Sequence, residues 1–507
     1  MKKFFCALLL MTAFFGGGKV LAQFTNRVWA FGDSAGISWL NSGTNPINFK
    51  TNSKWRNGSV SISDTNGLNC YAALFDNTST TNVCIWNKYN TLMQNGDYNY
   101  GGWWYHVNLF IPDPGNDSLL YMFGIGVTND PYGFYYSKLN YKANNDSGIV
   151  IQKNMQLNNF PAFDALMAVR HGNGSDWWLI FQRWYAPTFT TPSNEFFFYL
   201  IDDNGITGPF QQSIGLSHTT NGGHLVFDPT GDRFANISIK GMIELCYFDR
   251  CTGTITSTTP IEQEATAFPY PHYSSCAFSS DGTKLYVSEY SQTSAPSHLY
   301  QFDLNATNIS SSKTVIDSFV NPDIGINALK LAPDNKIYLA AADENFFVTY
   351  PDTMFTTINS NLSVINQPDS LGLACDFQPF SFYLGGARTY YGLPNNPDYE
   401  LGAWVGSPCD TLAVGVENLE PPQQAFFQAW YNSEWNMIHI NASKLKGRTG
   451  SLRLFDMEGR LVYEKKMEVI AGGYVTGEIP MNAVANGVYF VNLITESESV
   501  SSKTIKF

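Results

Sequence analysis

Clusters of adjacent aromatic residues are the first feature of this sequence that could bind a ligand. Trp103, Trp104 and Tyr105 are consecutive, and Trp177 is followed by Trp178. Their rings offer large flat surfaces that could stack on sugars. Neighbouring side chains of a strand point to opposite faces, so only alternate members of a cluster could share one binding surface. Bulky aromatic side chains more often fill the space between packed sheets, and we expect that role here.

Carboxylates could bind a divalent cation if the fold brought several of them together. Glu244, Glu289, Asp343 and Glu344 are candidates, but nothing in the sequence directs them to one place. Residues 202–205 read Asp-Asp-Asn-Gly. They lack the alternating ligands and the distal Glu of a calcium loop, so they predict a β-turn. We therefore predict no metal site and no cofactor.

Signatures of nucleophilic catalysis are weak in the sequence. It contains no His-Glu-x-x-His motif, and its one Gly-x-Ser-x-Gly match, at residues 32–36, is not followed by the helix pattern that a nucleophile elbow needs. A lone histidine is more often structural than catalytic, and the histidines are spread along the chain. They stand at positions 106, 171, 218, 224, 272, 298 and 439. We predict no catalytic residue.

The first 22 residues have the features of a secretory signal peptide. Lys2 and Lys3 precede an apolar stretch at residues 4–15, and Val20-Leu21-Ala22 predicts cleavage after Ala22. The apolar stretch is shorter than the roughly 20 residues of a membrane-spanning helix. No later stretch is apolar enough to span a membrane, so we expect the mature chain to have no transmembrane segment.

The charge of the mature chain restricts its partners. Without residues 1–22 it has 27 basic and 43 acidic residues, a net charge of −16. Such a surface repels phosphate backbones, so we expect no nucleic-acid partner. Only 14% of the residues are charged while 15% are aromatic, which is typical of a folded and well-packed chain.

Seven cysteines remain in the mature chain, and an odd number leaves at least one outside intramolecular disulfides. Cys70 and Cys84 could bridge a hairpin, and Cys246 and Cys251 a tighter one. Spacing alone decides neither pairing. No Cys-x-x-Cys pair exists, which argues against a zinc site.

A repeat in the middle of the chain predicts the elements that carry these residues. An apolar strand leads into a polar turn with Asp, Gly, Asn or Pro, and a second apolar strand follows. The last Gly or Asn of successive turns is separated by 48, 59, 57, 51 and 53 residues. The turns lie at residues 62–67, 111–115, 170–174, 227–231, 278–282 and 331–335. Repetition of a strand-rich unit near this length is typical of β-propeller blades.

We therefore predict an all-β fold in which residues 23–413 form a seven-bladed β-propeller. A single blade cannot bury both of its faces, and stacking neighbours around a ring does so. Residues 361–406 leave room for a seventh unit, which the strand 27–32 could complete and so close the ring. Six or eight blades stay open, and a pair of β-sandwiches is the weaker alternative because the spacing is regular.

The composition changes near residue 414. Residues 414–430 include Glu-Asn-Leu-Glu-Pro-Pro-Gln-Gln and predict an extended linker. Residues 431–507 contain the short alternating strands of a small Ig-like β-sandwich. The expected strands lie at residues 437–440, 451–455, 460–465, 473–478 and 488–494.

Three motifs follow one another near the C-terminal end. They are a Gly459-Arg460 hairpin, a Gly487-x-Tyr489 strand and a last strand that begins with Lys503. Together they resemble the type A sorting domain of the type IX secretion system, over residues 416–507. The resemblance implies Sec export to the periplasm and recognition by the type IX machinery of a Bacteroidota-type cell. The protein would then be released or anchored on the outer cell surface.

The middle of the chain resembles secreted propellers of Bacteroidota, with blades similar to WD-repeat and lactonase-like propellers. Short phrases such as Gly392-Leu-Pro-Asn395 carry this resemblance, which brings no catalytic residue with it. The sequence favours a non-enzymatic binding or scaffold protein that holds a glycan or a protein ligand. The alternative is a secreted hydrolase or lyase that acts on a polysaccharide or lactone through a metal site in the channel.

Overall fold

The computed structural model divides the chain into two compact units, residues 1–411 and 412–507. It describes residues 24–40, 46–55, 58–74, 83–102, 104–126, 131–186, 190–291, 295–320, 324–343, 354–410, 426–433, 436–443, 445, 449–468, 475–497 and 499–506. The expected signal peptide, residues 1–22, lies outside these described residues. Within them, no helix has the length and apolar character needed to cross a membrane.

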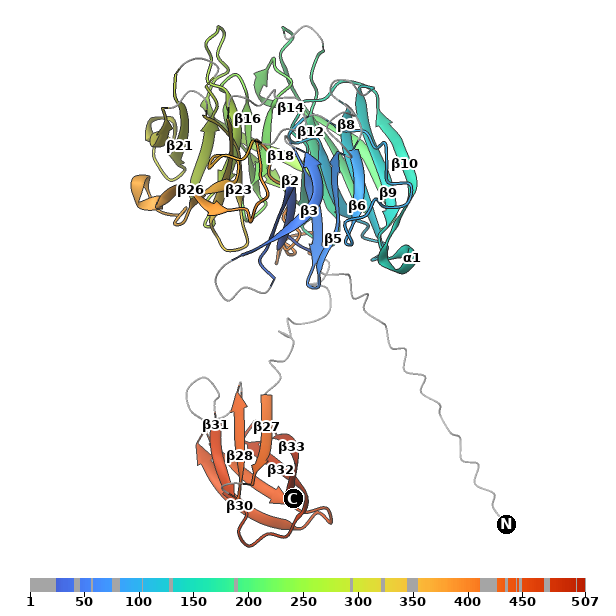
Figure 1. The fold of residues 1–507 in the computed structure, drawn as a ribbon, viewed down its shortest axis with the longest axis vertical. Helices are drawn as coiled ribbons and strands as arrows, with labels where there is room; N and C mark the ends of the chain where they lie inside the picture. The colour runs from blue at the N-terminus through green and yellow to red at the C-terminus, as the bar shows by residue number, and fades with distance from the viewer. Residues whose placement is uncertain are drawn as a thin grey trace, which may run out of the picture. The chain divides into compact units, whose positions relative to one another are not determined.

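Antiparallel sheets make up the first unit (Figure 1). Its first four-stranded sheet contains β1 (Phe24–Thr25), β4 (Val60–Asp64), β5 (Gly67–Leu74) and β6 (Val83–Asn87). The second contains β7 (Asn108–Pro112), β8 (Leu119–Gly126), β9 (Gly133–Asn140) and β10 (Ile149–Asn158). The third contains β11 (Met167–Arg170), β12 (Trp177–Gln182), β13 (Ser193–Asp202) and β14 (Gly205–His218). The described helical segments are short: α1 (Ala143–Asp146), η1 (Ser310–Ser312) and η3 (Gly372–Cys375).

Three further four-stranded sheets and one smaller sheet complete the described part of this unit. The fourth four-stranded sheet contains β15 (Gly223–Phe227), β16 (Arg233–Ser238), β17 (Ile243–Asp249) and β18 (Thr254–Glu262). The fifth contains β19 (Tyr273–Phe278), β20 (Lys284–Glu289), β21 (Ser297–Asp303) and β22 (Thr314–Phe319). The sixth contains β23 (Ile324–Leu331), β24 (Ile337–Asp343), β25 (Asn361–Ile365) and β26 (Phe377–Tyr383). The smaller one pairs β2 (Val28–Ser38) with β3 (Ile47–Trp55).

Each of the six repeated turns joins the first hairpin of a four-stranded sheet. The turns connect β4 to β5, β7 to β8, β11 to β12, β15 to β16, β19 to β20 and β23 to β24. Gly231 and Asn335 end two of these turns with φ of 73° and 61°, a conformation that Gly and Asn adopt most easily. The regular spacing in the sequence therefore reflects one hairpin for each sheet.

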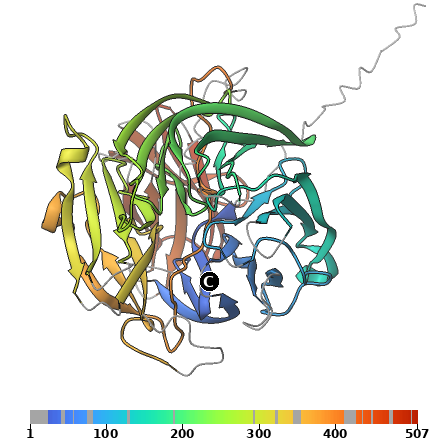
Figure 2. The same ribbon diagram turned by 90° about the horizontal axis from the view of Figure 1, so that it is seen from above.

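The sheets are arranged as a β-propeller, as the repeat predicted. The first strands of neighbouring sheets contact one another: β11 with β15, β15 with β19, and β19 with β23. Figure 2 shows the sheets side by side around a common axis. Because β2 and β3 form a sheet of only two strands, the count of seven blades stays a prediction.

The junction of the ring differs from the expected one. Residues 27–32 do not complete the sheet that contains β25 and β26, since β2 forms its own hairpin with β3. Nearly all of β2 is buried, so both of its faces need a packing partner. The backbone of Asp33 instead exchanges two hydrogen bonds with that of Arg388, at 2.8 and 3.2 Å. A buried Arg388–Asp33 ion pair of 2.9 Å joins the same two segments.

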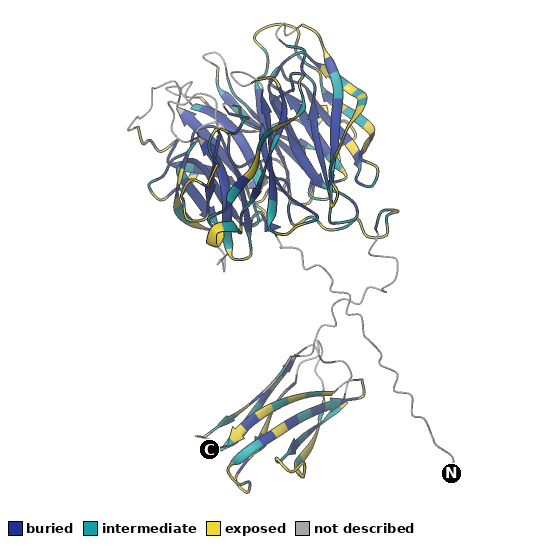
Figure 3. Ribbon diagram, turned by 90° about the vertical axis from the view of Figure 1, so that its right-hand side faces the viewer, coloured by how far each residue is buried: buried dark blue, intermediate teal, exposed yellow. Residues whose placement is uncertain are grey.

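Aromatic side chains fill the space between the sheets. Trp177 and Trp178 are buried, with 0% and 5% of their surface exposed, so their expected packing role is confirmed. Trp104 is partly buried against the same core, and Trp103 lies outside the described residues. Figure 3 shows that most strands of this unit are buried along their length. The outermost strands, such as β14, carry the exposed residues.

The second unit is a sandwich of two antiparallel sheets around its own core. One sheet contains β27 (Phe426–Asn432), β28 (Met437–Ser443) and β31 (Val475–Pro480), and the other contains β29 (Thr449–Phe455), β30 (Leu461–Glu468), β32 (Gly487–Thr495) and β33 (Ser499–Lys506). The expected Ig-like sandwich is present. The expected linker at 414–430 extends too far, because the backbone of β27 pairs with β28 from Phe426 onward.

Candidate functional site

The last part of the first unit, residues 387–410, runs along the propeller axis rather than in a sheet, and we name it the exit segment. Residues 390–397 within it are buried. The side-chain amide of Asn395 donates to the carbonyls of Asn108 and Leu166, at 3.2 and 3.0 Å. The Tyr399 hydroxyl donates to the Phe110 carbonyl at 2.8 Å. These contacts fix the exit segment against β7 and the start of β11.

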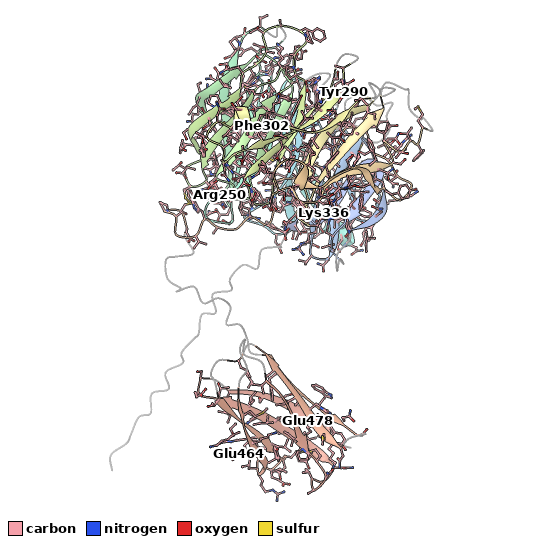
Figure 4. All side chains as sticks on the ribbon, turned by 90° about the vertical axis from the view of Figure 1, so that its left-hand side faces the viewer. Arg250, Tyr290, Phe302, Lys336, Glu464 and Glu478 are labelled. Atoms are coloured by element: carbon pink, nitrogen blue, oxygen red, sulfur yellow. A yellow bond between two sulfur atoms is a disulfide. The ribbon has the colours of Figure 1, made fainter. Side chains whose placement is uncertain are left out.

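Two arginines and a disulfide hold the end of the exit segment. Arg170 donates to the Tyr399 carbonyl at 3.0 Å, and Arg250, which Figure 4 labels, donates to the Gly402 carbonyl at 2.5 Å. Cys251 and Cys409 form a disulfide with a Cα–Cα distance of 5.4 Å. Because Arg250 and Cys251 follow β17 directly, the sheet that contains β17 anchors the end of the exit segment.

Both disulfides considered from the sequence are wrong. Cys251 pairs with Cys409, while Cys246 lies in β17 with its side chain in the core. Cys70 and Cys84 are out of register, because Cys70 faces Asn87 and Cys84 faces Ala73 across the β5–β6 pair. No bond joins them in the structure. The true partners are separated by 158 residues, and only the path of the exit segment brings them together.

A cavity of about 340 Å³ lies on the axis between the inner strands and the exit segment, and we name it the axial cavity. Strands β11, β15, β19 and β23 contribute its walls, together with residues 393–401. Arg27, Asp398 and Glu400 are exposed residues of its lining and mark its open side. Arg27 and Glu400 form an ion pair of 3.2 Å. Polar groups from segments far apart in sequence therefore meet in one half-enclosed space.

Two stacked imidazoles line the axial cavity. The rings of His106 and His224 lie 3.8 Å apart with an angle of 13° between their planes. Burial lowers the pKa of His106 to about 4 and that of His224 well below its usual value, so both are neutral at pH 7. The His224 Nδ1 accepts a hydrogen bond from the Cys276 amide, which places its proton on Nε2. The His106 Nδ1 donates to the Gly223 carbonyl.

Lys330 supplies a cationic group to the cavity wall. Its Nζ donates to the Asn396 carbonyl at 3.1 Å and lies 5.7 Å from the centre of the Trp29 ring. Burial lowers the pKa of Lys330 to about 8, and the negative charge of Asp398 acts in the opposite direction. The ammonium is therefore the main form at pH 7, with a fraction of free amine larger than for an exposed lysine.

Glu244 and Glu289, two of the carboxylates singled out from the sequence, do not line the axial cavity. Glu244 is buried between sheets, where it accepts a hydrogen bond from the Leu216 amide at 2.9 Å and where burial raises its pKa. Glu289 accepts from the Tyr300 hydroxyl at 2.6 Å. Asp343 ends β24, and Glu344 lies outside the described residues. In the described part of the chain, no three His, Cys, Asp or Glu side chains are grouped to hold a metal ion.

Apart from His106 and His224, the sequence did not indicate the residues that line the cavity. Lys330, Asn395 and Asp398 belong to no motif that signals chemistry. The polar run Asn395-Asn396-Pro397-Asp398, placed between apolar neighbours, is the one sequence signal that could have marked this segment. Its meaning depends on the fold, because these residues meet Lys330 and the histidines only when the exit segment enters the axis.

Buried histidines should make the propeller less stable as the pH falls, and His218 gives the clearest test. Burial lowers its pKa to about 4, and the nearby charge of Lys240 adds to this. The unfolded chain takes up a proton near pH 6.5, which the folded chain resists until about pH 4. The contribution of the neutral His218 to the free energy of unfolding is therefore fully present above about pH 6.5 and is lost as the pH falls below it.

Between pH 7 and pH 5, we expect the free energy of unfolding of wild type to fall by about 2 kcal/mol more than that of His218→Gln. The measurement is denaturant unfolding of both proteins at the two pH values. Parallel losses in the two proteins would contradict the neutral, buried state of His218.

The residues of the C-terminal motifs lie in the second unit. Gly459 stands in the turn between β29 and β30 with φ of 79°, a conformation that favours glycine. Arg460 follows it and pairs with Asp456 at 2.8 Å. Gly487 begins β32, and Tyr489 is buried with its hydroxyl bonded to the Ala485 carbonyl at 2.6 Å. The fifth motif residue, Lys503, lies on β33 opposite Phe490. The turn and the buried Tyr489 have structural roles in the sandwich.

Comparison with known families identifies this unit. Residues 432–506 match the model of the secretion system C-terminal sorting domain. The second unit is a type IX sorting domain. The sorting domain implies that the propeller is a cargo of the type IX machinery and is exported. No curated protein matches the chain.

Several solved structures resemble the chain at low identity. PorZ, a surface component of the type IX secretion system of Porphyromonas gingivalis, is 11% identical, with 95% of this chain and 69% of that chain covered and a TM-score of 0.28. A quinonprotein alcohol dehydrogenase-like protein of Bacteroides thetaiotaomicron is 9% identical, with 73% and 78% covered and a TM-score of 0.39. We assign the propeller fold from the sheet topology of this chain alone, because similarities with such low TM-scores do not support a fold assignment.

Proposed function

We propose that this protein is a non-enzymatic binding protein of the outer cell surface or the medium. In this proposal, residues 1–22 direct Sec export, the sorting domain directs passage through the type IX machinery, and the propeller holds a ligand. The observation that carries the binding role is the axial cavity. It combines an open side, apolar walls and polar groups that converge from separate strands, which are the features of small-molecule sites.

The position of the exit segment favours a ligand that binds inside the channel over one that passes through it. Residues 390–397 are buried along the axis and bonded to the inner strands, so the chain itself occupies part of the channel. A ligand would enter from the side marked by Arg27, Asp398 and Glu400 and stop against the exit segment and the histidines. This geometry favours a site of limited size over a groove for a long polymer.

A second function is favoured by one observation. The lowered pKa of Lys330 provides a larger fraction of free amine at neutral pH, and such an amine can act as a base or a nucleophile. A hydrolase or lyase that acts on a polysaccharide or lactone would then use Lys330. This version of the alternative does not depend on the carboxylates that were considered from the sequence.

A thermal-shift screen of the full chain separates the two functions. Saccharides, lactones, peptides and divalent cations would be tested, each with and without chelator, and the reaction mixtures would be examined for products. Binding to the folded state raises the melting temperature by mass action, with about 2.7 kcal/mol expected at a ligand concentration of 100 Kd. We expect a chelator-insensitive rise and an unchanged ligand. A product that wild type forms and Lys330→Met does not form would contradict the non-enzymatic role.

A further inference from the structure

We propose that the outer face of the four-stranded sheet of the sorting domain is the surface by which the secretion machinery recognises this protein. An apolar patch beside a lysine forms this surface, and it fits a partner that offers an apolar surface and a carboxylate. This inference rests on the proposed export through the sorting domain and names the surface that performs this step. The members of the surface, which we name the docking patch, are Phe455, Leu461, Val488, Phe490, Lys503 and Ile505.

The pairing of the strands places these side chains on one face of the sheet. Directly paired residues, and residues two apart on one strand, have side chains on the same face. One row of paired residues crosses β30, β29, β32 and β33 in turn, and it consists of Leu461, Phe455, Phe490 and Lys503. Val488 pairs with Ile505 in the adjacent row, two residues further along β32 and β33. The docking patch therefore spans all four strands.

The docking patch lies on the face of the sheet that points away from the core of the sandwich. Leu454 and Tyr489, which alternate with members of the patch along β29 and β32, belong to that core. Within the patch, 42% of Phe490, 50% of Leu461 and 50% of Ile505 are exposed. An antiparallel sheet that packs on one face is usually polar on the other face. Contiguous exposed apolar side chains in such positions mark a site of interaction with another molecule.

The next row on the same face shows the usual polar pattern. Arg453, two residues before Phe455, forms an ion pair of 2.8 Å with Glu464, which Figure 4 labels. Asn492 and Ser501 continue this row across β32 and β33. The large apolar side chains that this sheet exposes therefore gather at the end that adjoins the turn at residues 456–460. This local concentration favours a specific contact surface over scattered exposed residues, which are common on any protein.

The residues that carry the resemblance to the sorting family adjoin the docking patch. Arg460 and Gly487 directly precede two of its members in the chain, and Lys503 is a member itself, opposite Phe490. Residues 432–506 match the model of a secretion system sorting domain. A sorting domain acts by being recognised, so it needs a surface that a partner can contact. The occupant that these observations favour is the secretion machinery rather than a second copy of this chain.

Lys503 determines the charge that the partner should carry. Its side chain is exposed, and its ammonium forms no ion pair with another described residue. Arg460, by contrast, pairs with Asp456 and Glu458 of its own turn. A partner that covers the apolar residues also covers Lys503, and a buried charge without a counter-charge is costly. The partner surface should therefore place an Asp or Glu opposite Lys503.

The test is export of full-length variants from cells that have a type IX machinery. The patch variant combines Phe490→Thr with Ile505→Thr, because threonine suits a strand and removes most of the apolar surface. The matched control is Trp430→Thr, since Trp430 is 43% exposed and lies on β27 of the other sheet. A second pair, Lys503→Glu and Lys503→Arg, changes an exposed side chain and leaves the core of the sandwich intact.

We expect the amount of the patch variant on the surface and in the medium to fall at least about tenfold, as for a loss of about 1.4 kcal/mol of binding free energy. The periplasmic amount should rise accordingly, and Trp430→Thr should be exported as wild type is. Lys503→Arg keeps the positive charge and should be exported at least about tenfold better than Lys503→Glu, which opposes the carboxylate of the partner. Melting curves that match wild type show that each variant is folded. If the patch variant melts earlier, the Lys503 pair decides the test.

Several outcomes would overturn the inference. They are export of a folded patch variant in wild-type amounts, equal retention of the patch variant and Trp430→Thr, and equal export of Lys503→Glu and Lys503→Arg. A dimeric wild type together with a monomeric patch variant in sedimentation would assign the docking patch to a second copy and would also overturn it. The proposed export route fails separately, if the chain without residues 426–507 reaches the surface. Retention of that truncated chain, with normal export of the patch variant, would contradict the docking patch alone.

Discussion

Removing residues 426–507 is expected to leave the propeller folded and to keep it in the periplasm. The sorting domain has a separate core and forms its own compact unit, so the propeller keeps its own core when the sorting domain is removed. It also carries the match to the secretion sorting family. The measurement is fractionation of cells that express either the full chain or the truncated chain, with detection of the protein in periplasm, outer surface and medium.

Two controls make this result specific to sorting. The truncated chain should keep the melting temperature of the propeller and the Cys251–Cys409 disulfide, which shows that it has folded. Transfer of residues 426–507 to an unrelated periplasmic protein should send that protein across the outer membrane. Delivery of the truncated chain to the surface in normal amounts would contradict the sorting role.

Replacing Cys251 and Cys409 by serine is expected to lower the free energy of unfolding of the propeller by about 4 kcal/mol. The disulfide closes a loop with a sequence separation of 158 residues, and the loss of loop entropy in the unfolded chain grows with loop length. In the folded chain it also fixes the exit segment, which lines the axial cavity. The measurement is denaturant unfolding of wild type and of the double variant.

Reduced wild type is the matched control and should unfold like the double variant. Cys246→Ala should lose less stability and should retain the Cys251–Cys409 link in peptide mapping, since Cys246 lies in the core and takes no part in the disulfide. Equal stability of oxidised and reduced wild type, or a mapped bond between Cys246 and Cys251, would contradict the arrangement described.

The sequence predicted the parts of the fold that local patterns determine. The turns ending at Gly231, Gly282 and Asn335 are visible because each needs residues suited to positive φ next to apolar strands. The strands of the sorting domain are visible because their apolar residues alternate. Both signals arise from neighbours in the chain, so no knowledge of distant contacts was needed.

The exit segment and the cavity could not be predicted in this way. Asn395 contacts the carbonyl of a residue 229 positions away, and Tyr399 contacts one 289 positions away. Nothing in the local sequence distinguishes an exit segment along the axis from one more blade. The disulfide was missed for the same reason, because pairing by nearness in sequence favoured Cys246 over Cys409.

The candidate site shows a related limit. A search for chemistry in the sequence finds charged and aromatic residues first, and these proved to be packed elsewhere, as Trp177 and Glu244 are. The polar groups that line the axial cavity include an ordinary lysine, Lys330, and two isolated histidines, His106 and His224. They meet only in the complete fold, so nothing local in the sequence marks them as one site.

A crystal structure of the secreted protein, grown with the ligand that raises its melting temperature, tests the central claim most directly. We expect an intact ligand in the axial cavity, within hydrogen-bond distance of Lys330 Nζ. Density for the ligand at another place on the propeller, or for a product in place of the intact ligand, would contradict a non-enzymatic binding site built by the exit segment.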